Sequence, residues 1–163
     1  MLNYLKDKLR YTPIHYTWWR VKQWAQYLLW NLKGRPGPIP PQLHKMRTLK
    51  QLAQHYKLNT VVETGTLYGE PPAYLAPTGA TIYTIELADH FHTMALKRFA
   101  NKPNVKCLKG DSGDVLPNLL PTLQNPTLFW LDGHFSAADT AKGIEDTPVA
   151  REIAAITQHP PRP

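Results

Sequence analysis

Two acidic residues each end a short apolar run, and a glycine-bearing turn follows the first of them. The first run ends at Glu63 and leads into Gly65-Thr66-Leu67-Tyr68-Gly69, and the second run ends at Glu86. Glycines let a backbone turn sharply and come close to a ligand. Glu86 lies 21 positions after Gly65, a spacing at which an acid can accept hydrogen bonds from both hydroxyls of a ribose. The pattern is typical of a βαβ unit that binds a cofactor with an adenosine half.

Two further polar groups follow apolar runs later in the chain. Asp111 and Ser112 come directly after one run, where their oxygens can accept an adenine amino group or cap the next helix. Asp132 and His134 follow another run, with Gly133 between them, and can bind a divalent metal such as Mg²⁺ or hold a substrate hydroxyl. Each of these candidate residues could instead have a purely structural role, as a turn glycine, a helix cap, a solvated charge at a strand end or a structural histidine.

Strand-like and helix-like segments alternate along the part of the chain that carries these residues. Continuous apolar strands suit a parallel sheet that is covered on both faces. The alternation predicts a doubly wound, Rossmann-like α/β sheet, with the acids gathered at the carboxyl ends of its strands. Strands are expected at residues 60–63, 81–86, 105–108 and 127–132, and helices at 43–56, 71–75, 89–100, 115–123 and 146–157. Four strands make only the first part of a usual doubly wound domain, so we expect a truncated or minimal sheet with an exposed edge.

The motifs, in this order, resemble those of the class I S-adenosylmethionine-dependent methyltransferases. The nearest pattern is that of O-methyltransferases related to catechol O-methyltransferase and to sugar and macrolide O-methyltransferases. Residues 63–69 are similar to the E-x-G-x-x-x-G first motif of that group, residues 110–117 to its adenine-side motif, and residues 131–134 to the acid after its fourth strand. The resemblance covers residues 45–157 and departs from the family at Glu70-Pro71-Pro72, where the first helix begins.

The resemblance implies methyl transfer from S-adenosylmethionine to a hydroxyl of a small-molecule or glycan-like acceptor. In this comparison Glu63 helps to hold the ammonium group of the cofactor and Glu86 holds its ribose hydroxyls. Asp132 is the metal ligand or the acid that orients the acceptor, and His134 is the candidate base. The full set of residues that the resemblance assigns to the cofactor is Glu63, Gly65, Tyr68, Gly69, Glu86, Asp111 and Ser112.

The N-terminal third of the chain differs in charge from the remainder. Residues 1–50 carry ten of the 19 lysines and arginines but a single acid, Asp7. Apolar residues recur on one face of a helix predicted at residues 14–32, and Gly34 and several prolines end that helix. We therefore expect a basic, tryptophan-rich extension at residues 1–41 and the α/β domain at residues 42–163. The repeating apolar positions are Ile14, Trp18, Val21, Ala25, Leu28 and Leu32.

The predicted helix at residues 14–32 is too charged to span a bilayer. It can lie on an anionic membrane surface, with its tryptophans at headgroup depth, or pack as part of the core. Binding of nucleic acid is disfavoured because no recognised nucleic-acid module accompanies the helix. A single cysteine, Cys107, and the lack of a signal-peptide cleavage site predict a cytoplasmic protein, membrane-associated if the helix binds lipid.

Two other functions are consistent with parts of the sequence. One is an NAD-type Rossmann oxidoreductase, although the turn reads G-x-x-x-G in place of G-x-G-x-x-G and no Tyr-x-x-x-Lys pair follows the fourth strand. The other is a non-catalytic module that binds a membrane surface or a partner protein and carries a degenerate α/β domain. The basic, tryptophan-rich helix and the short sheet are the observations behind the second alternative.

Overall fold

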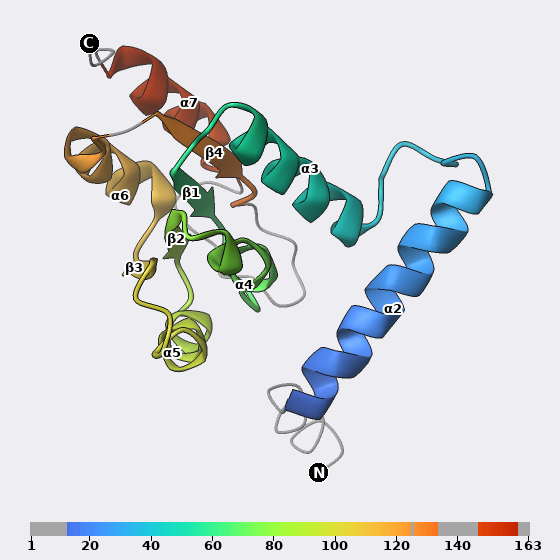
Figure 1. Ribbon diagram of the computed structural model, residues 1–163. Helices are drawn as coiled ribbons and strands as arrows, with labels where there is room; N and C mark the ends of the chain where they lie inside the picture. Colours follow the sequence, from blue (N-terminus) through green and yellow to red (C-terminus); the bar gives the residue numbers. More distant parts are fainter. Residues whose placement is uncertain (1–12, 125, 134–146, 160–163) are drawn as a thin grey trace. The chain divides into compact units, whose positions relative to one another are not determined.

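The computed structural model describes residues 13–124, 126–133 and 147–159, and the side chains from residue 17 onward (Figure 1). The chain divides into two compact units, residues 1–49 and residues 50–163. The boundary falls inside a helix, α3 (Gln42–His55).

The second unit is built on a parallel sheet. Its described strands are β1 (Thr60–Thr64), β2 (Thr81–Glu86), β3 (Val105–Lys109) and β4 (Thr127–Leu131). They lie in the order β3-β2-β1-β4, and every pairing is parallel. All five residues of β1 are buried, as expected for a central strand that is covered on both faces. The α/β architecture predicted from the alternation of segments is confirmed.

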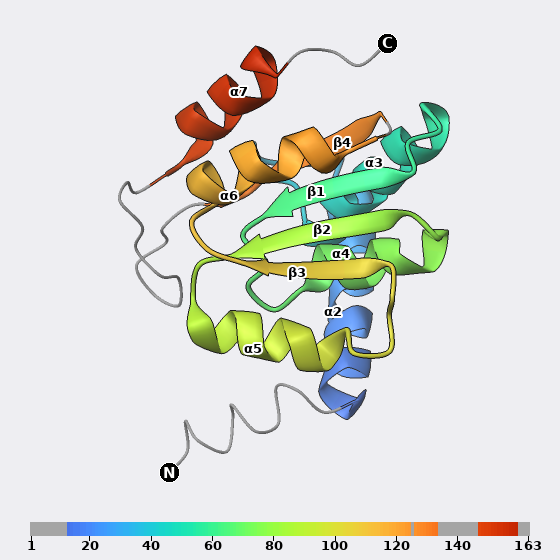
Figure 2. The same ribbon diagram turned by 90° about the vertical axis from the view of Figure 1, so that its left-hand side faces the viewer.

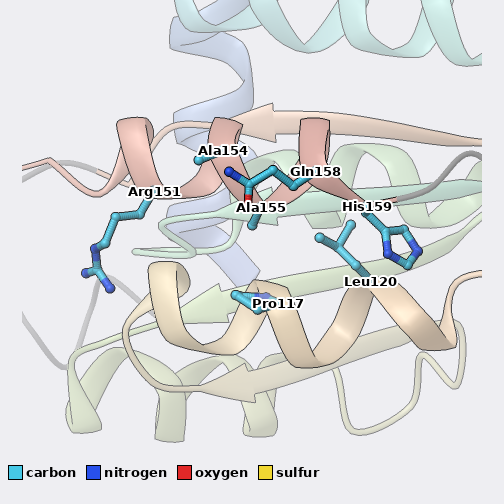
Figure 3. A pocket seen from close by; sticks show the side chains of 7 residues that line it. All are labelled: Pro117, Leu120, Arg151, Ala154, Ala155, Gln158 and His159. Carbon is cyan, nitrogen blue, oxygen red and sulfur yellow. The ribbon is translucent and has the colours of Figure 1, made fainter.

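Helices cover both faces of this sheet (Figure 2). They are α4 (Glu70–Leu75), α5 (Asp89–Arg98), α6 (Ser112–Leu119) and α7 (Val149–Gln158), with short 3₁₀ turns at Ala76–Thr78 and Leu120–Thr122. One core lies between the sheet and the pair α6 and α7, where Val62 and Ile85 contact Leu116 and Leu119. Figure 1 shows α4 on the opposite side of the sheet from α6.

Two helices begin three positions away from the start that the sequence predicted. The helix expected at residues 115–123 begins at Ser112, because the Asp111 side chain accepts a hydrogen bond from the Gly113 N–H at 2.9 Å and caps the first turn. The helix expected at residues 146–157 begins at Val149, directly after Pro148. Local capping decides such boundaries, and apolar periodicity does not report it.

The first unit contains α2 (Pro13–Leu32), and this confirms the predicted N-terminal helix. Gly34 and Arg35 follow it with φ angles of 74° and 61°, so the chain leaves the helix through left-handed backbone. The Trp30 indole N–H then donates to the Pro36 carbonyl oxygen at 3.1 Å. Within the described residues, no helix has both the length and the apolar content needed to cross a bilayer.

Candidate cofactor and acceptor site

The order of the strands makes the carboxyl ends of β1 and β4 the expected place of a ligand. The chain runs from β1 outward to β2 and β3, and then returns to the other side of β1 to form β4. Open α/β sheets bind their ligands where the direction of strand addition reverses, because the connections after the two strands diverge there. Thr64 of β1 is in register with Leu131 of β4, so the residues that follow these two strands are neighbours.

Gly65 is required where these two strand ends meet. Its φ angle is 83°, and a Cβ atom at this position would lie 2.9 Å from the backbone carbonyl oxygen of Asp132. The Gly133 N–H donates to the Thr64 Oγ1 at 3.1 Å, and the Asp132 N–H donates to the Thr64 carbonyl oxygen at 3.3 Å. The predicted first glycine and the predicted acceptor-side acid therefore lie against each other.

The other end of the glycine turn is packed against α5. Gly69 has a φ angle of 71°, and a Cβ atom there would lie 2.9 Å from the Phe99 ring. The Tyr68 ring meets the Phe91 ring edge-on, with 5.2 Å between the ring centroids. These contacts hold the turn in one conformation, as a loop that binds a ligand through its backbone requires.

Arg98 also holds this turn, through a hydrogen bond and an ion pair. Its guanidinium donates to the carbonyl oxygen of Tyr68, and its Nη1 lies 3.0 Å from the Glu70 Oε1. The sequence analysis did not single out Arg98, because nothing in the local sequence connects it with a turn about 30 positions earlier. Its position in the last turn of α5 brings it there.

Glu63 is buried, and its carboxyl group is hydrogen-bonded in a network with two threonine hydroxyls. The Thr84 hydroxyl donates to the Glu63 Oε2 at 2.7 Å and lies 2.6 Å from the Thr66 hydroxyl. Burial is the main cause that raises the pKa of Glu63 well above its ordinary value. The Thr84 hydrogen bond is the next-largest effect and lowers this pKa, the negative charges of Asp132 and Glu86 raise it, and Arg98 lowers it slightly.

Glu86 is almost fully buried and is held by two backbone amides. Its Oε2 accepts a hydrogen bond from the Leu67 N–H at 2.8 Å, and its Oε1 accepts one from the Ala88 N–H at 2.8 Å. The carboxylate therefore lies against the glycine turn, as an acid that serves the same ligand must. Each oxygen keeps a second lone pair with which it can accept a ligand hydroxyl.

Asp111 and Ser112 lie at the start of α6. Besides capping the helix, the Asp111 carboxylate pairs with the Arg151 guanidinium at 2.9 Å. The capping role that the sequence left open as an alternative is therefore present. The role of Asp111 and Ser112 toward an adenine remains a prediction.

The acceptor side is described only in part. Asp132 is half-buried directly after β4, whereas His134 lies outside the described residues. Among residues 13–124, 126–133 and 147–159, no three His, Cys, Asp or Glu side chains gather as metal ligands would. The described residues by themselves therefore do not make a magnesium site around Asp132.

Glu152 of α7 is a residue that the sequence analysis missed. Its side chain is fully buried, and neither carboxyl oxygen has a hydrogen-bond partner among the described residues. Burial raises its pKa, and the nearby hydroxyls of Ser112 and Thr64 oppose that shift without reaching good hydrogen-bond geometry. The sequence did contain one indication that Glu152 is buried. Ala155 and Ile156 pack on the core, and Glu152 lies three and four positions before them, so it shares their helix face.

Comparison with known proteins gave matches among solved structures alone. A comparison with protein-family models found no match, and neither did one with curated proteins. The chain is similar to the S-adenosylhomocysteine-bound methyltransferase PaMTH1 of Podospora anserina, with a TM-score of 0.50 and 16% identity over 80% of this chain and 54% of that one.

Two bacterial structures match over a similar region. The O-methyltransferase from Bacillus cereus, in complex with S-adenosylhomocysteine, gives a TM-score of 0.47 and 20% identity over 66% of this chain and 53% of that one. The O-methyltransferase TomG from Streptomyces achromogenes, in complex with S-adenosylmethionine, gives a TM-score of 0.41 and 23% identity over 64% of this chain and 47% of that one. The chain thus spans about half the length of these proteins.

The strand order and the structural match together define the fold. The chain has the Rossmann-like α/β fold of the class I S-adenosylmethionine-dependent methyltransferases. The resemblance drawn from the sequence motifs is confirmed at this level.

Proposed function

We propose that this chain binds S-adenosylmethionine and transfers its methyl group to a hydroxyl of a small-molecule or glycan-like acceptor. The observation that carries the proposal is the gathering of three carboxylates near the carboxyl ends of β1, β2 and β4. Glu63, Glu86 and Asp132 lie close enough for the two other carboxylates to raise the pKa of Glu63. S-adenosylmethionine carries a sulfonium and an ammonium group, and negative charges favour both.

The beginning of α4 favours this cofactor over a nicotinamide dinucleotide. A pyrophosphate binds at a helix N-terminus through free backbone N–H groups. Here α4 begins with Glu70, Pro71 and Pro72, so its first turn lacks two N–H donors, and Arg98, the base at this turn, is already paired with Glu70. The Leu67 N–H in the preceding turn is donated to the Glu86 carboxylate. These features oppose a dianionic ligand and support the methyltransferase proposal over the oxidoreductase alternative.

The proposed roles are those that the resemblance to the methyltransferases implies. The turn that contains Gly65, Tyr68 and Gly69 would hold the methionine part, beside Glu63. Glu86 would accept the ribose hydroxyls through its remaining lone pairs, and Asp111 with Ser112 would face the adenine. These assignments complete the cofactor site that the sequence predicted.

The cofactor would supply an electrophilic methyl group, and the protein would align the acceptor with it. Asp132 is proposed to orient the acceptor hydroxyl and His134 to remove its proton. The described residues provide no set of ligands for a metal ion, and neither of these proposed roles uses one.

Calorimetric titration of the purified chain with S-adenosylhomocysteine tests cofactor binding. We expect binding of S-adenosylhomocysteine and none of NAD. Glu86→Ala should weaken this affinity by about 1–3 kcal/mol, since it removes charged hydrogen-bond acceptors. Asp89→Ala is the matched control: it removes a nearby carboxylate whose side chain is 95% exposed, and it should leave the affinity unchanged. A folded chain that binds NAD alone, or neither ligand, would contradict the proposal.

Turnover is tested separately with Asp132→Asn. Over a panel of hydroxyl-bearing acceptors, formation of S-adenosylhomocysteine should be lost while the affinity for the cofactor is retained. Full activity of this variant would remove Asp132 from the reaction. Cofactor binding without turnover on any acceptor by the unaltered chain would favour the non-catalytic alternative.

A further inference from the structure

One face of α2 exposes an unusual amount of apolar surface. Large apolar side chains are normally exposed singly, so a continuous row of them indicates a surface that something covers. The row follows the spacing of one helix face, and we call it the α2 stripe. It consists of Trp18 (61% exposed), Val21 (63%), Ala25, Leu28 (54%), Leu29 (55%) and Leu32 (82%).

The opposite face of α2 is already occupied within the first unit. The Trp30 and Tyr27 rings lie 4.9 Å and 6.2 Å from the His44 ring, centroid to centroid. The Arg47 guanidinium lies over the rings of Tyr27 and Trp24, 5.3 Å and 5.5 Å from their centroids. The helix therefore has a partner on one face, and the α2 stripe is the face without one among the described residues of this unit.

The charges around the stripe have a single sign. Residues 13–62 contain no aspartate or glutamate. Lys22 and Lys33 follow Trp18 and Leu29 by four positions, which places both lysines along one edge of the stripe. Arg20 precedes Trp24 and Tyr27 by four and seven positions and therefore lies on the opposite face, and all three bases are exposed. The Lys22 Nζ lies 5.6 Å from the centre of the Trp18 ring.

We propose that the α2 stripe binds the surface of a bilayer that contains anionic phospholipids. An apolar face with lysines along one edge suits a helix that lies parallel to the bilayer, with aliphatic side chains and Trp18 among the headgroups and the lysines near lipid phosphates. α2 itself is not apolar enough to span a bilayer, so the proposed contact is with its surface.

Two other occupants fit the stripe less well. Nucleic acid would use the bases and aromatic rings, but it leaves the aliphatic residues Val21, Leu28 and Leu32 without a function. A second copy of the chain would bring the same positive charges together without any acid in this segment to pair with them. The described stripe also spans only about two heptads, fewer than a coiled coil of this kind needs.

Binding of the full chain to vesicles tests the proposal. We expect cosedimentation with phosphatidylcholine vesicles that contain phosphatidylglycerol, weaker binding to phosphatidylcholine alone, and weaker binding at high salt. Leu28→Ser combined with Leu32→Ser should abolish cosedimentation. Leu96→Ser is the control, because Leu96 is 51% exposed on α5, about as much as Leu28.

A second set of variants tests the charges. Lys22→Gln with Lys33→Gln should weaken binding to the anionic vesicles by at least about tenfold, since each base near such a surface contributes roughly a fivefold factor. The same change at two exposed lysines of the second unit, Lys97 and Lys102, should have a much smaller effect.

Three outcomes would overturn the proposal. The first is a folded chain that binds no vesicles, and the second is vesicle binding that the stripe variants leave unchanged. The third is self-association, or binding to a polyribonucleotide, that Leu28→Ser with Leu32→Ser abolishes while vesicles are not bound. Circular dichroism of each variant shows that α2 remains folded.

Discussion

At the carboxyl edge of the sheet, the buried acidic residues on the two faces differ in their hydrogen bonding. Successive side chains of a strand point to opposite faces, so Glu63 lies on one face of β1 and Thr64 on the other. On the Glu63 face, Glu63 accepts a hydroxyl and Glu86 accepts two backbone amides. On the Thr64 face, Glu152 is buried without a partner among the described residues.

This difference follows from where the partners come from in the chain. The partners on the Glu63 face belong to the β1 turn and to β2, at most 21 positions apart. On the Thr64 face, α7 supplies the contacts, as in the Arg151–Asp111 pair, which joins residues 40 positions apart. Groups held by a short loop are satisfied as that loop forms, whereas Glu152 depends on how α7 docks. A buried polar group without a partner is rare and indicates a functional role or a ligand.

The largest effect is expected where the two faces meet, at Gly65. Gly65→Ala would place a Cβ atom 2.9 Å from a backbone oxygen, whereas Gly79→Ala, at the same φ of 83°, has nothing within 4 Å. Both substitutions strain left-handed backbone by about 1–2 kcal/mol. We expect Gly65→Ala to lower the free energy of unfolding by about 1–3 kcal/mol more than Gly79→Ala, because of overpacking. Urea denaturation measures the free energy of unfolding of both variants. Equal losses would show that the segment after β4 can shift to make room for the added Cβ atom.

Replacing Glu152 by an apolar residue should stabilise the protein. Glu152→Met removes a buried carboxyl without a partner, and we expect a gain of about 1–3 kcal/mol at pH 8. The raised pKa of Glu152 sets the sign: the acid contributes fully below its unfolded pKa, and this contribution is lost as the pH rises through its folded pKa. The gain should therefore be smaller at pH 4. Ile153→Met, at an exposed neighbour, should change nothing at either pH.

Glu63 tests the same pH dependence on the hydrogen-bonded face. Its folded pKa is raised as well, so it contributes most stability at low pH and less as the pH rises above the ordinary range of a glutamate. Glu63→Gln keeps an acceptor for the Thr84 hydroxyl and removes the titration, so the fall in stability with rising pH should become shallower. Thermal unfolding from pH 4 to pH 8 measures this, and an unchanged slope would contradict the assigned pKa shift.

The smallest effects are expected at the two acids that pair with Arg151. Asp111 is mostly buried and also caps α6, whereas Asp114 is exposed. Asp111→Asn retains part of the cap, so it should cost about 1 kcal/mol of stability, and Asp114→Asn should cost less than about 0.5 kcal/mol. Chemical denaturation in low and high salt measures both losses of stability, and equal losses would mean that the greater burial of the Asp111–Arg151 pair does not strengthen it.

The sequence predicted much of the fold, because apolar periodicity is a local property of the chain. β2 was predicted with its observed bounds and α2 to within one residue at its start. Glu86 was singled out by its spacing from Gly65, and the structure places its carboxylate against the glycine turn. The pattern of strand, turn and strand carries this information because a short loop brings its own ends together.

Only the tertiary structure showed which groups from distant segments meet. It placed Arg98 on the glycine turn and Glu152 beside Thr64 and Ser112, and within the first unit it gave the α2 stripe no partner among the described residues. Periodicity shows which residues share a face of a helix, but not what that face contacts. The contacts depend on the rotation and docking of whole elements, which the packing of many side chains decides together.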